Sequence, residues 1–152
     1  MINEGKLAPD FELLDDHGVN RHLSDFRGKN VILYFYPKDD TSGCTTEACN
    51  FRDSYEKYQS SGTVILGVSP DSVKSHVSFK EKYQLPFSLL ADNEHKVCEL
   101  YGTWGKKKKL GREYDGVFRT TFLIGPDGVI QKVFENVKPT DHSTEVLTAL
   151  GI

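Results

Sequence analysis

The chain has 152 residues, of which 38% are hydrophobic and 27% charged, and its formal net charge at pH 7 is −3. This size and composition are typical of one soluble domain, expected over residues 1–152, and the charge gives no general reason to bind nucleic acid. The longest apolar run, Val31–Tyr36, is far shorter than the about 20 residues that cross a bilayer, so no membrane association is expected.

The first six residues contain no apolar leader segment, and the chain has three cysteines. Cysteines in a chain without a leader fit a reducing compartment, where paired thiols are more often catalytic than structural. The sequence therefore predicts a cytoplasmic location.

Segments typical of strands alternate with segments typical of helices. Residues 11–26, with a turn at Gly18, predict a small hairpin, and Val31–Tyr36 predicts a buried strand. A helix is expected from Cys44 to about Ser60. The further expected elements, in chain order, are the strand Thr63–Ser69, a helix capped by Asp71 that ends at Tyr83, the strand Phe87–Ala91, a helix capped by Asp92 that contains Val97, Leu100 and Tyr101, the strands Arg119–Ile124 and Val129–Phe134, and the helix His142–Leu150, capped by Thr140.

This order of elements predicts an α/β fold with a central mixed sheet and helices on both faces. The Gly-Pro-Asp-Gly segment at 125–128 is a strong hairpin signal between the last two strands. Ligands of such sheets usually bind at the carboxyl ends of the strands. Cys44 lies just beyond the carboxyl end of the first long strand, which makes it the leading candidate for a functional residue.

Cys44 follows a buried strand and a turn rich in Asp, Thr, Ser and Gly, at the expected start of a helix. The N-terminus of a helix offers unpaired N–H groups and about half a positive charge, which favour a thiolate over a thiol. This placement indicates cysteine redox chemistry.

The second cysteine of this segment, Cys49, lies five residues further along. On an intact helix that spacing is about 7.5 Å along the axis and about 140° around it, whereas a disulfide needs a Cα–Cα separation of about 4.4–6.8 Å. A Cys44–Cys49 disulfide therefore requires the first turns of the helix to unwind, which predicts a folded reduced form and a locally unfolded oxidised form. Judged on the two cysteines alone, Cys49 is equally well explained as a small buried apolar residue.

The pattern Pro37-x-x-x-Thr41-x-x-Cys44 resembles the active-site motif of the peroxiredoxins, thiol peroxidases with a thioredoxin-like fold. The chain is most similar to the branch called bacterioferritin comigratory protein or PrxQ. The likeness runs through nearly the whole chain, and its other segments are residues 5–11, 34–37, 67–69, 89–92, 101–102 and 122–124.

The resemblance implies that Cys44 is the peroxidatic cysteine, whose thiolate attacks a peroxide oxygen and becomes a sulfenic acid. It implies that the Thr41 hydroxyl bonds the sulfur and the peroxide, and that Pro37 shields the thiolate. Arg119 would hold the thiolate and the charge that develops on the departing oxygen. Cys49 would be the resolving cysteine that condenses with the sulfenic acid.

The same resemblance implies hydrogen peroxide and small organic hydroperoxides as substrates, and thioredoxin or a similar dithiol protein as reductant. It also implies a monomer. The five histidines show no ligand spacing, the two cysteines lack a C-x-x-C zinc pattern, and no glycine-rich phosphate loop is found, so no metal and no bound cofactor are expected.

Several of these residues also have simpler explanations. Pro37 ends a strand in any case, and Thr41 suits a local turn or cap. Glu47 is placed either to reach the N–H groups at the helix start or to pair with Arg119. Cys98 is expected to pack as a small apolar residue, with a resolving role as a distant second possibility.

Lys106–Lys109 is expected to be a solvated loop rather than a binding site. Two alternative functions stay open. A thiol–disulfide oxidoreductase shares the strand–cysteine–helix layout but has a C-x-x-C pair that this chain lacks. A peroxide-sensing binding module would expose a partner surface when oxidation of Cys44 unwinds the helix.

Overall fold

The computed structural model describes residues 2–152, and within them seven strands form one mixed sheet. The order is β2-β1-β5-β4-β3-β8-β9, in which β3 pairs in parallel with β4 and antiparallel with β8. The strands are β1 (Glu12–Asp15), β2 (Asn20–His22), β3 (Asn30–Phe35), β4 (Thr63–Ser69), β5 (Ser88–Ala91), β8 (Thr120–Ile124) and β9 (Ile130–Phe134).

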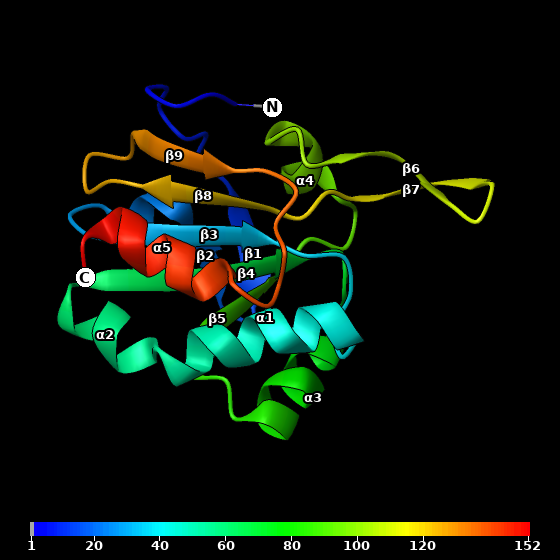
Figure 1. Cartoon of the computed structure of the whole chain (residues 1–152), viewed down its shortest axis with the longest axis horizontal. Coiled ribbons are helices and arrows are strands. Elements are labelled where there is room, and N and C mark those ends of the chain that lie inside the picture. The colour runs from blue at the N-terminus through cyan, green and yellow to red at the C-terminus, as the bar shows by residue number, and fades with distance from the viewer. Residues whose placement is uncertain (1) are drawn as a thin grey trace.

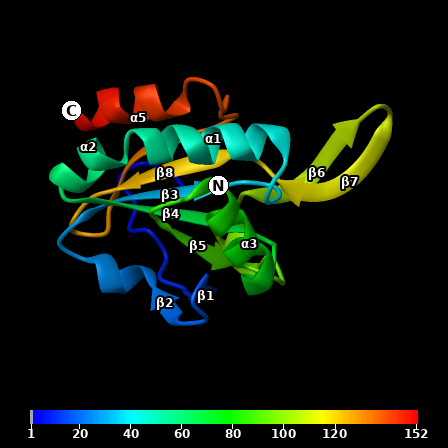
Figure 2. The same ribbon diagram turned by 90° about the horizontal axis from the view of Figure 1, so that it is seen from below.

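Helices cover both faces of the sheet (Figures 1 and 2). One face packs against α1 (Ser42–Asp53), α2 (Tyr55–Ser60), α3 (Val73–Tyr83) and α5 (His142–Leu150), and the other against α4 (Lys96–Leu100) and the 3-10 helix η1 (Leu23–Phe26). Alternate side chains of a strand point to opposite faces. Ile32 and Tyr34 of β3 accordingly join the first core, and Leu33 and Phe35 join the second. This arrangement confirms the predicted α/β class.

The predicted strands agree with the structure to within about one residue at each end, and β4 matches residue for residue. The helix expected from Cys44 to Ser60 is interrupted. Ser54, with φ −103° and ψ 7°, separates α1 from α2. Its N–H is shared between the carbonyl oxygens of Asn50 and Phe51, both at 3.3 Å, so the regular bond to the fourth residue back is long and is shared with a 3-10 type bond.

Two predicted helix caps are wrong by one residue. Ser72, not Asp71, caps α3, because the Ser72 side chain accepts the N–H of Ser75 at 3.1 Å. The N-cap of α5 is Asp141 rather than Thr140.

Asp92 acts on α4 as expected, although the N-cap position belongs to His95. Its two carboxylate oxygens accept the N–H groups of Val97 at 3.2 Å and Cys98 at 2.8 Å. These bonds satisfy two N–H groups in the first turn of a short helix.

Two further strands, β6 (Trp104–Lys109) and β7 (Arg112–Val117), form a separate hairpin that projects from the body of the molecule (Figures 1 and 2). The run Lys106–Lys109 therefore lies in a strand and not in the expected loop. Leu110 and Gly111, with φ of 54° and 77°, form the two-residue turn that such hairpins favour.

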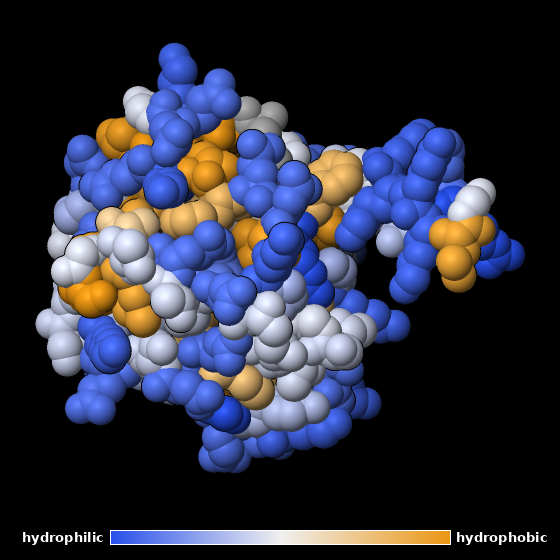
Figure 3. Space-filling view, in the orientation of Figure 1, coloured by the Kyte–Doolittle hydropathy of each residue, from blue (hydrophilic) through white to orange (hydrophobic). Residues whose placement is uncertain are grey.

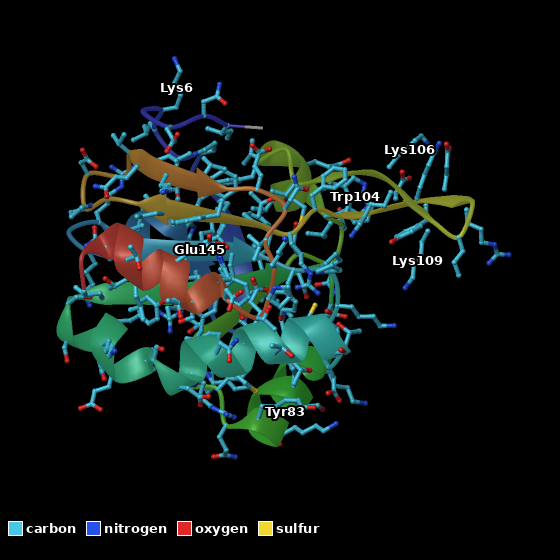
Figure 4. The ribbon with its side chains drawn as sticks, in the orientation of Figure 1. Lys6, Tyr83, Trp104, Lys106, Lys109 and Glu145 are labelled. Atoms are coloured by element: carbon cyan, nitrogen blue, oxygen red, sulfur yellow. The ribbon has the colours of Figure 1, made fainter. Side chains whose placement is uncertain are left out.

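The projecting hairpin is hydrophilic along its length and apolar at its tip, where Leu110 is 96% exposed (Figure 3). Lys106 and Lys109 extend from opposite sides of it (Figure 4). Over residues 2–152, no helix combines the length and the apolar character needed to span a membrane.

Candidate active site

The candidate site lies where β3 ends and β8 begins. Antiparallel pairing of these strands places Phe35 opposite Thr120. The segment after Phe35 leads into α1, and Arg119 directly precedes Thr120. The register of the two strands therefore brings Arg119 to Cys44, although 75 residues separate them in the sequence.

Cys44 is buried in the first turn of α1, with 1% of its surface exposed. Thr41 is the N-cap residue, and its carbonyl oxygen accepts the N–H of Thr45 at 2.8 Å. The helix dipole and the unpaired N–H groups of this turn favour negative charge near the sulfur. The position predicted from the sequence is the one observed.

Arg119 joins Cys44 to Glu47. Its Nη2 donates to Cys44 Sγ at 3.1 Å, and its Nη1 donates to Glu47 Oε1 at 3.3 Å. The guanidinium lies against Gly43, where an added Cβ would stand 2.7 Å from Nη2. The absence of a side chain at Gly43 therefore leaves the room in which Arg119 reaches the sulfur.

Glu47 is 2% exposed. Of the two roles that the sequence leaves open for it, contact with the N–H groups at the helix start or an ion pair with Arg119, the structure shows the ion pair. Burial raises the pKa of the Glu47 carboxyl to about 7, and the positive charge of Arg119 opposes this effect. The site thus contains a carboxyl group that changes charge near neutral pH, next to the guanidinium that contacts Cys44.

Pro37 and Thr41 lie at the two ends of the segment that leads into α1. Pro37 is half-buried, and Thr41 is exposed. The Thr41 hydroxyl donates to the carbonyl oxygen of Lys38 at 2.9 Å. Its single hydrogen is therefore directed to the backbone and not to the sulfur of Cys44, in contrast to the contact that the resemblance implies.

Cys49 is half-buried on the same helix as Cys44, and both are free thiols. Because α1 runs unbroken from Ser42 to Asp53, the two sulfur atoms cannot bond in this conformation. Burial raises the pKa of the Cys49 thiol. Cys98 is buried in α4, and burial together with the charge of Asp92 raises its pKa well above the usual range, which fits a packing role.

Three potential metal ligands lie close together behind the site. Ligand atoms of Asp39, Asp71 and His76 are within 4.8 Å of one another. These residues already bond one another, because His76 Nδ1 lies 2.7 Å from Asp39 Oδ2 and Asp71 Oδ2 accepts the N–H of Asp39 at 2.8 Å. The cluster is a hydrogen-bonded network that joins the active-site segment to α3.

Gly43 and Asp39 are two residues of the site that the sequence pattern does not single out. Glycine is unfavourable inside a helix, so its place directly before Cys44 is the signal that points to a close approach. No comparable signal exists for Asp39, because two of its side-chain partners, Ser75 and His76, come from a helix more than thirty residues away.

Comparisons with known proteins agree with this geometry. Residues 5–133 match the AhpC/TSA family. Over 149 residues the chain is 53% identical to peroxiredoxin Bcp of Bacillus subtilis and 43% identical to peroxiredoxin Bcp of Escherichia coli. These matches cover 98% of this chain and 95% and 96% of the two relatives. The chain is a peroxiredoxin of the Bcp/PrxQ branch.

Solved structures of relatives superpose closely on this peroxiredoxin. PrxQ of Xylella fastidiosa, in a cysteine-to-serine mutant, matches with a TM-score of 0.94 and 34% identity over 99% of this chain and 96% of that one. The bacterioferritin comigratory protein of Xanthomonas campestris matches with a TM-score of 0.88 and 35% identity, over 93% and 90% of the two chains. The thioredoxin-like fold and the thiol peroxidase class expected from the sequence are confirmed.

Gly43→Ala is predicted to keep the fold and to impair this peroxiredoxin. Alanine suits a helix, but its Cβ would displace the Arg119 guanidinium from the sulfur. Loss of one charge-assisted hydrogen bond is expected to lower the second-order rate constant of the reduced protein with hydrogen peroxide about 10-fold or more. Stopped-flow kinetics of the reduced protein measure this constant, and circular dichroism checks the fold.

Two control experiments test whether Gly43→Ala lowers the rate constant by displacing Arg119. Ser42→Ala changes the exposed neighbouring residue and is expected to leave the rate constant unchanged. In an Arg119→Ala background, Gly43→Ala is expected to add little, because the contact it disturbs is already absent. Equal effects of Gly43→Ala with and without Arg119 would contradict the assignment.

Glu47→Gln is predicted to change how stability depends on pH. The folded-state pKa of about 7 lies above the ordinary value of 4.5, so the folded protein binds the extra proton between these values. The wild-type free energy of unfolding therefore loses a contribution on the order of 2 kcal/mol as pH rises from about 4.5 to about 7. Glutamine has no such loss.

Urea unfolding of both reduced proteins at pH 5 and pH 8 provides the measurement. The stability of the glutamine variant relative to wild type is expected to increase from the lower to the higher pH. A difference that stays constant, or that changes in the opposite direction, would show that Glu47 does not titrate in this range in the folded state.

Proposed function

We propose that this peroxiredoxin reduces hydrogen peroxide and small organic hydroperoxides through attack by the Cys44 thiolate. The main support is the hydrogen bond from Arg119 Nη2 to Cys44 Sγ at 3.1 Å, formed at the N-terminus of α1. A guanidinium and a helix N-terminus both favour a thiolate, and the guanidinium is also suited to an oxygen that gains negative charge.

In the first step, the thiolate attacks the terminal, hydroxyl-bearing oxygen of the hydroperoxide. An S–O bond forms, the O–O bond breaks, and Cys44 becomes a sulfenic acid. The second peroxide oxygen leaves with the electron pair of the broken bond and takes a proton from water to become an alcohol or water. Arg119 is placed to stabilise the negative charge during this transfer.

Thr41 contributes to this step as an acceptor in our proposal. Its hydrogen is donated to Lys38, but a hydroxyl oxygen keeps lone pairs that can accept another hydrogen bond. The O–H of a bound hydroperoxide is a suitable donor. Pro37, half-buried beside this segment, would limit the access of water to the sulfur.

In the second step, the thiolate of Cys49 attacks the Cys44 sulfur. A disulfide forms, and the sulfenic oxygen leaves as water after it takes up a proton. Because the two residues lie on one helix, the first turns of α1 must unwind before the sulfur atoms meet.

In the third step, a dithiol protein reduces the disulfide by exchange and becomes oxidised itself. We propose thioredoxin as this reductant, a monomeric enzyme and a cytoplasmic location, in keeping with the sequence. The relative from Xanthomonas campestris is described as having alkyl peroxide reduction activity, which supports the inclusion of organic hydroperoxides.

Turnover of hydrogen peroxide coupled to NADPH, thioredoxin and thioredoxin reductase tests these roles. Cys44→Ser is expected to abolish turnover, because no sulfenic acid can form. Cys49→Ser is expected to consume about one peroxide per chain and then stop, because the sulfenic acid is not resolved. Cumene hydroperoxide in place of hydrogen peroxide tests the organic substrates.

Cys98→Ala is the matched control, since it removes a buried thiol away from the site and is expected to leave turnover intact. Activity without Cys44 would overturn the proposed function. Full thioredoxin-linked activity without Cys49 would keep Cys44 as the attacking residue but assign resolution to another thiol.

A further inference from the structure

The segment 37–41, between β3 and α1, is held to the body of the protein through Asp39. The carboxylate of Asp39 accepts the hydroxyl of Tyr36 at 2.5 Å and the hydroxyl of Ser75 at 2.8 Å, and it lies 2.7 Å from His76 Nδ1. The other nitrogen of His76 donates to the carbonyl oxygen of Leu90 at 3.0 Å. Asp39 is 8% exposed and His76 is fully buried, so water competes little for these bonds.

The neighbouring residue, Asp40, is held by the C-terminal end of the same helix. Its two carboxylate oxygens accept Tyr83 Oη and Lys82 Nζ, both at 2.7 Å. Asp40 has a positive φ of 56°, a conformation that aspartate tolerates better than most residues. Two consecutive carboxylates of the active-site segment thus point to one helix, α3.

The end of α3 also contacts the last turn of α1. Arg52 Nη1 donates to the carbonyl oxygen of Tyr83 at 2.7 Å. Figure 4 shows Tyr83 on α3 beside α1. We refer to Ser75, His76, Lys82 and Tyr83 as the α3 clasp, because all four bond the segment before α1.

We propose that the α3 clasp positions the active-site segment for the reaction with peroxide and that its release limits formation of the Cys44–Cys49 disulfide. Unwinding of the first turns of α1 must move the segment to which Asp39 and Asp40 belong, so the bonds to α3 resist it. The inference rests on the proposed function, and it assigns positioning roles to residues that do not touch the sulfur.

The two chemical steps respond to the clasp in opposite directions. Attack on peroxide requires the folded segment, because only there does Arg119 contact Cys44. Disulfide formation, in which the sulfenic oxygen leaves as water, requires release. A weaker clasp therefore speeds the second step and leaves the first step unchanged or slower.

The clasp also competes with a second oxidation. A sulfenic acid that stays in the folded site can react with another hydroperoxide, which yields a sulfinic acid and an alcohol or water. Faster release therefore gives more disulfide and less sulfinic acid at the same peroxide concentration.

The test variant is Lys82→Gln with Tyr83→Phe, which removes both partners of Asp40 while the active-site segment keeps its sequence. Ser75→Ala is an independent variant that removes one donor to Asp39. Lys74→Gln is the matched control, since it makes the same charge change at an exposed position of α3 for which the described residues give no ion pair.

Two measurements are made on each protein. Hydrogen exchange of the reduced protein, without peroxide, reports release of residues 38–46. Rapid mixing with hydrogen peroxide, followed by thiol alkylation and mass spectrometry, gives rate constants for the sulfenic acid, the disulfide and the sulfinic acid.

Lys82→Gln/Tyr83→Phe is expected to exchange and to form the disulfide about 3- to 10-fold faster than wild type, as the loss of one exposed ion pair and one hydrogen bond suggests. Ser75→Ala is expected to increase the rates of hydrogen exchange and of disulfide formation as well. Lys74→Gln is expected to change neither rate. The rate constant of the first oxidation is expected to be unchanged or lower. The proposal is overturned if wild type forms the disulfide and the variants show neither faster hydrogen exchange nor faster disulfide formation than wild type.

Failure of the proposed function has a different outcome. If peroxide produces no Cys44–Cys49 disulfide in wild type, the proposed resolution step is wrong. Accelerated hydrogen exchange in the variants would then still support the clasp as the contact that holds the segment, and unchanged exchange would overturn it.

Discussion

The contact between Arg119 and Cys44 is the interaction on which the rest of this site depends. It joins the start of α1 to the residue before β8. Three other features of the structure support this contact. The register of β3 and β8 brings the two residues together, Gly43 leaves space for the guanidinium, and Glu47 holds its other nitrogen. All three features help to fix the position of the arginine.

In the proposed mechanism, the site must satisfy two requirements that conflict. A reactive sulfur needs the first turn of α1, since the helix N-terminus and the arginine both act there. A disulfide with Cys49 needs the same turn to unwind. Hydrogen bonds from a neighbouring helix are well suited to this conflict, because they hold the segment without adding apolar burial that would make release slow. The contacts of Asp39 and Asp40 with α3 are of this kind.

The sequence predicts the parts of the structure that local patterns determine. The apolar strand before Cys44, the motif and the order of strands and helices are all local, and they agree with the structure. The charge of Lys106–Lys109 predicts a loop, but the pairing of these residues with Arg112–Asp115 makes them part of a strand. The sequence predicts Asp71 as a helix cap, but its carboxylate accepts the Ser69 hydroxyl and the Asp39 N–H instead. The Asp39–Asp71 contact joins distant segments, whereas the lysine strand pairs with the strand that directly follows it.

The antiparallel pairing of β3 and β8 has a consequence for the tolerance of this chain to insertions. Neighbouring strand residues are about 3.4 Å apart and point to opposite faces, so a slip of one residue between the strands would turn Arg119 away from Cys44. Residues added within Thr120–Ile124 would cause such a slip. The projecting hairpin of β6 and β7 ends before this register begins, so its length can vary without any change in the position of the arginine.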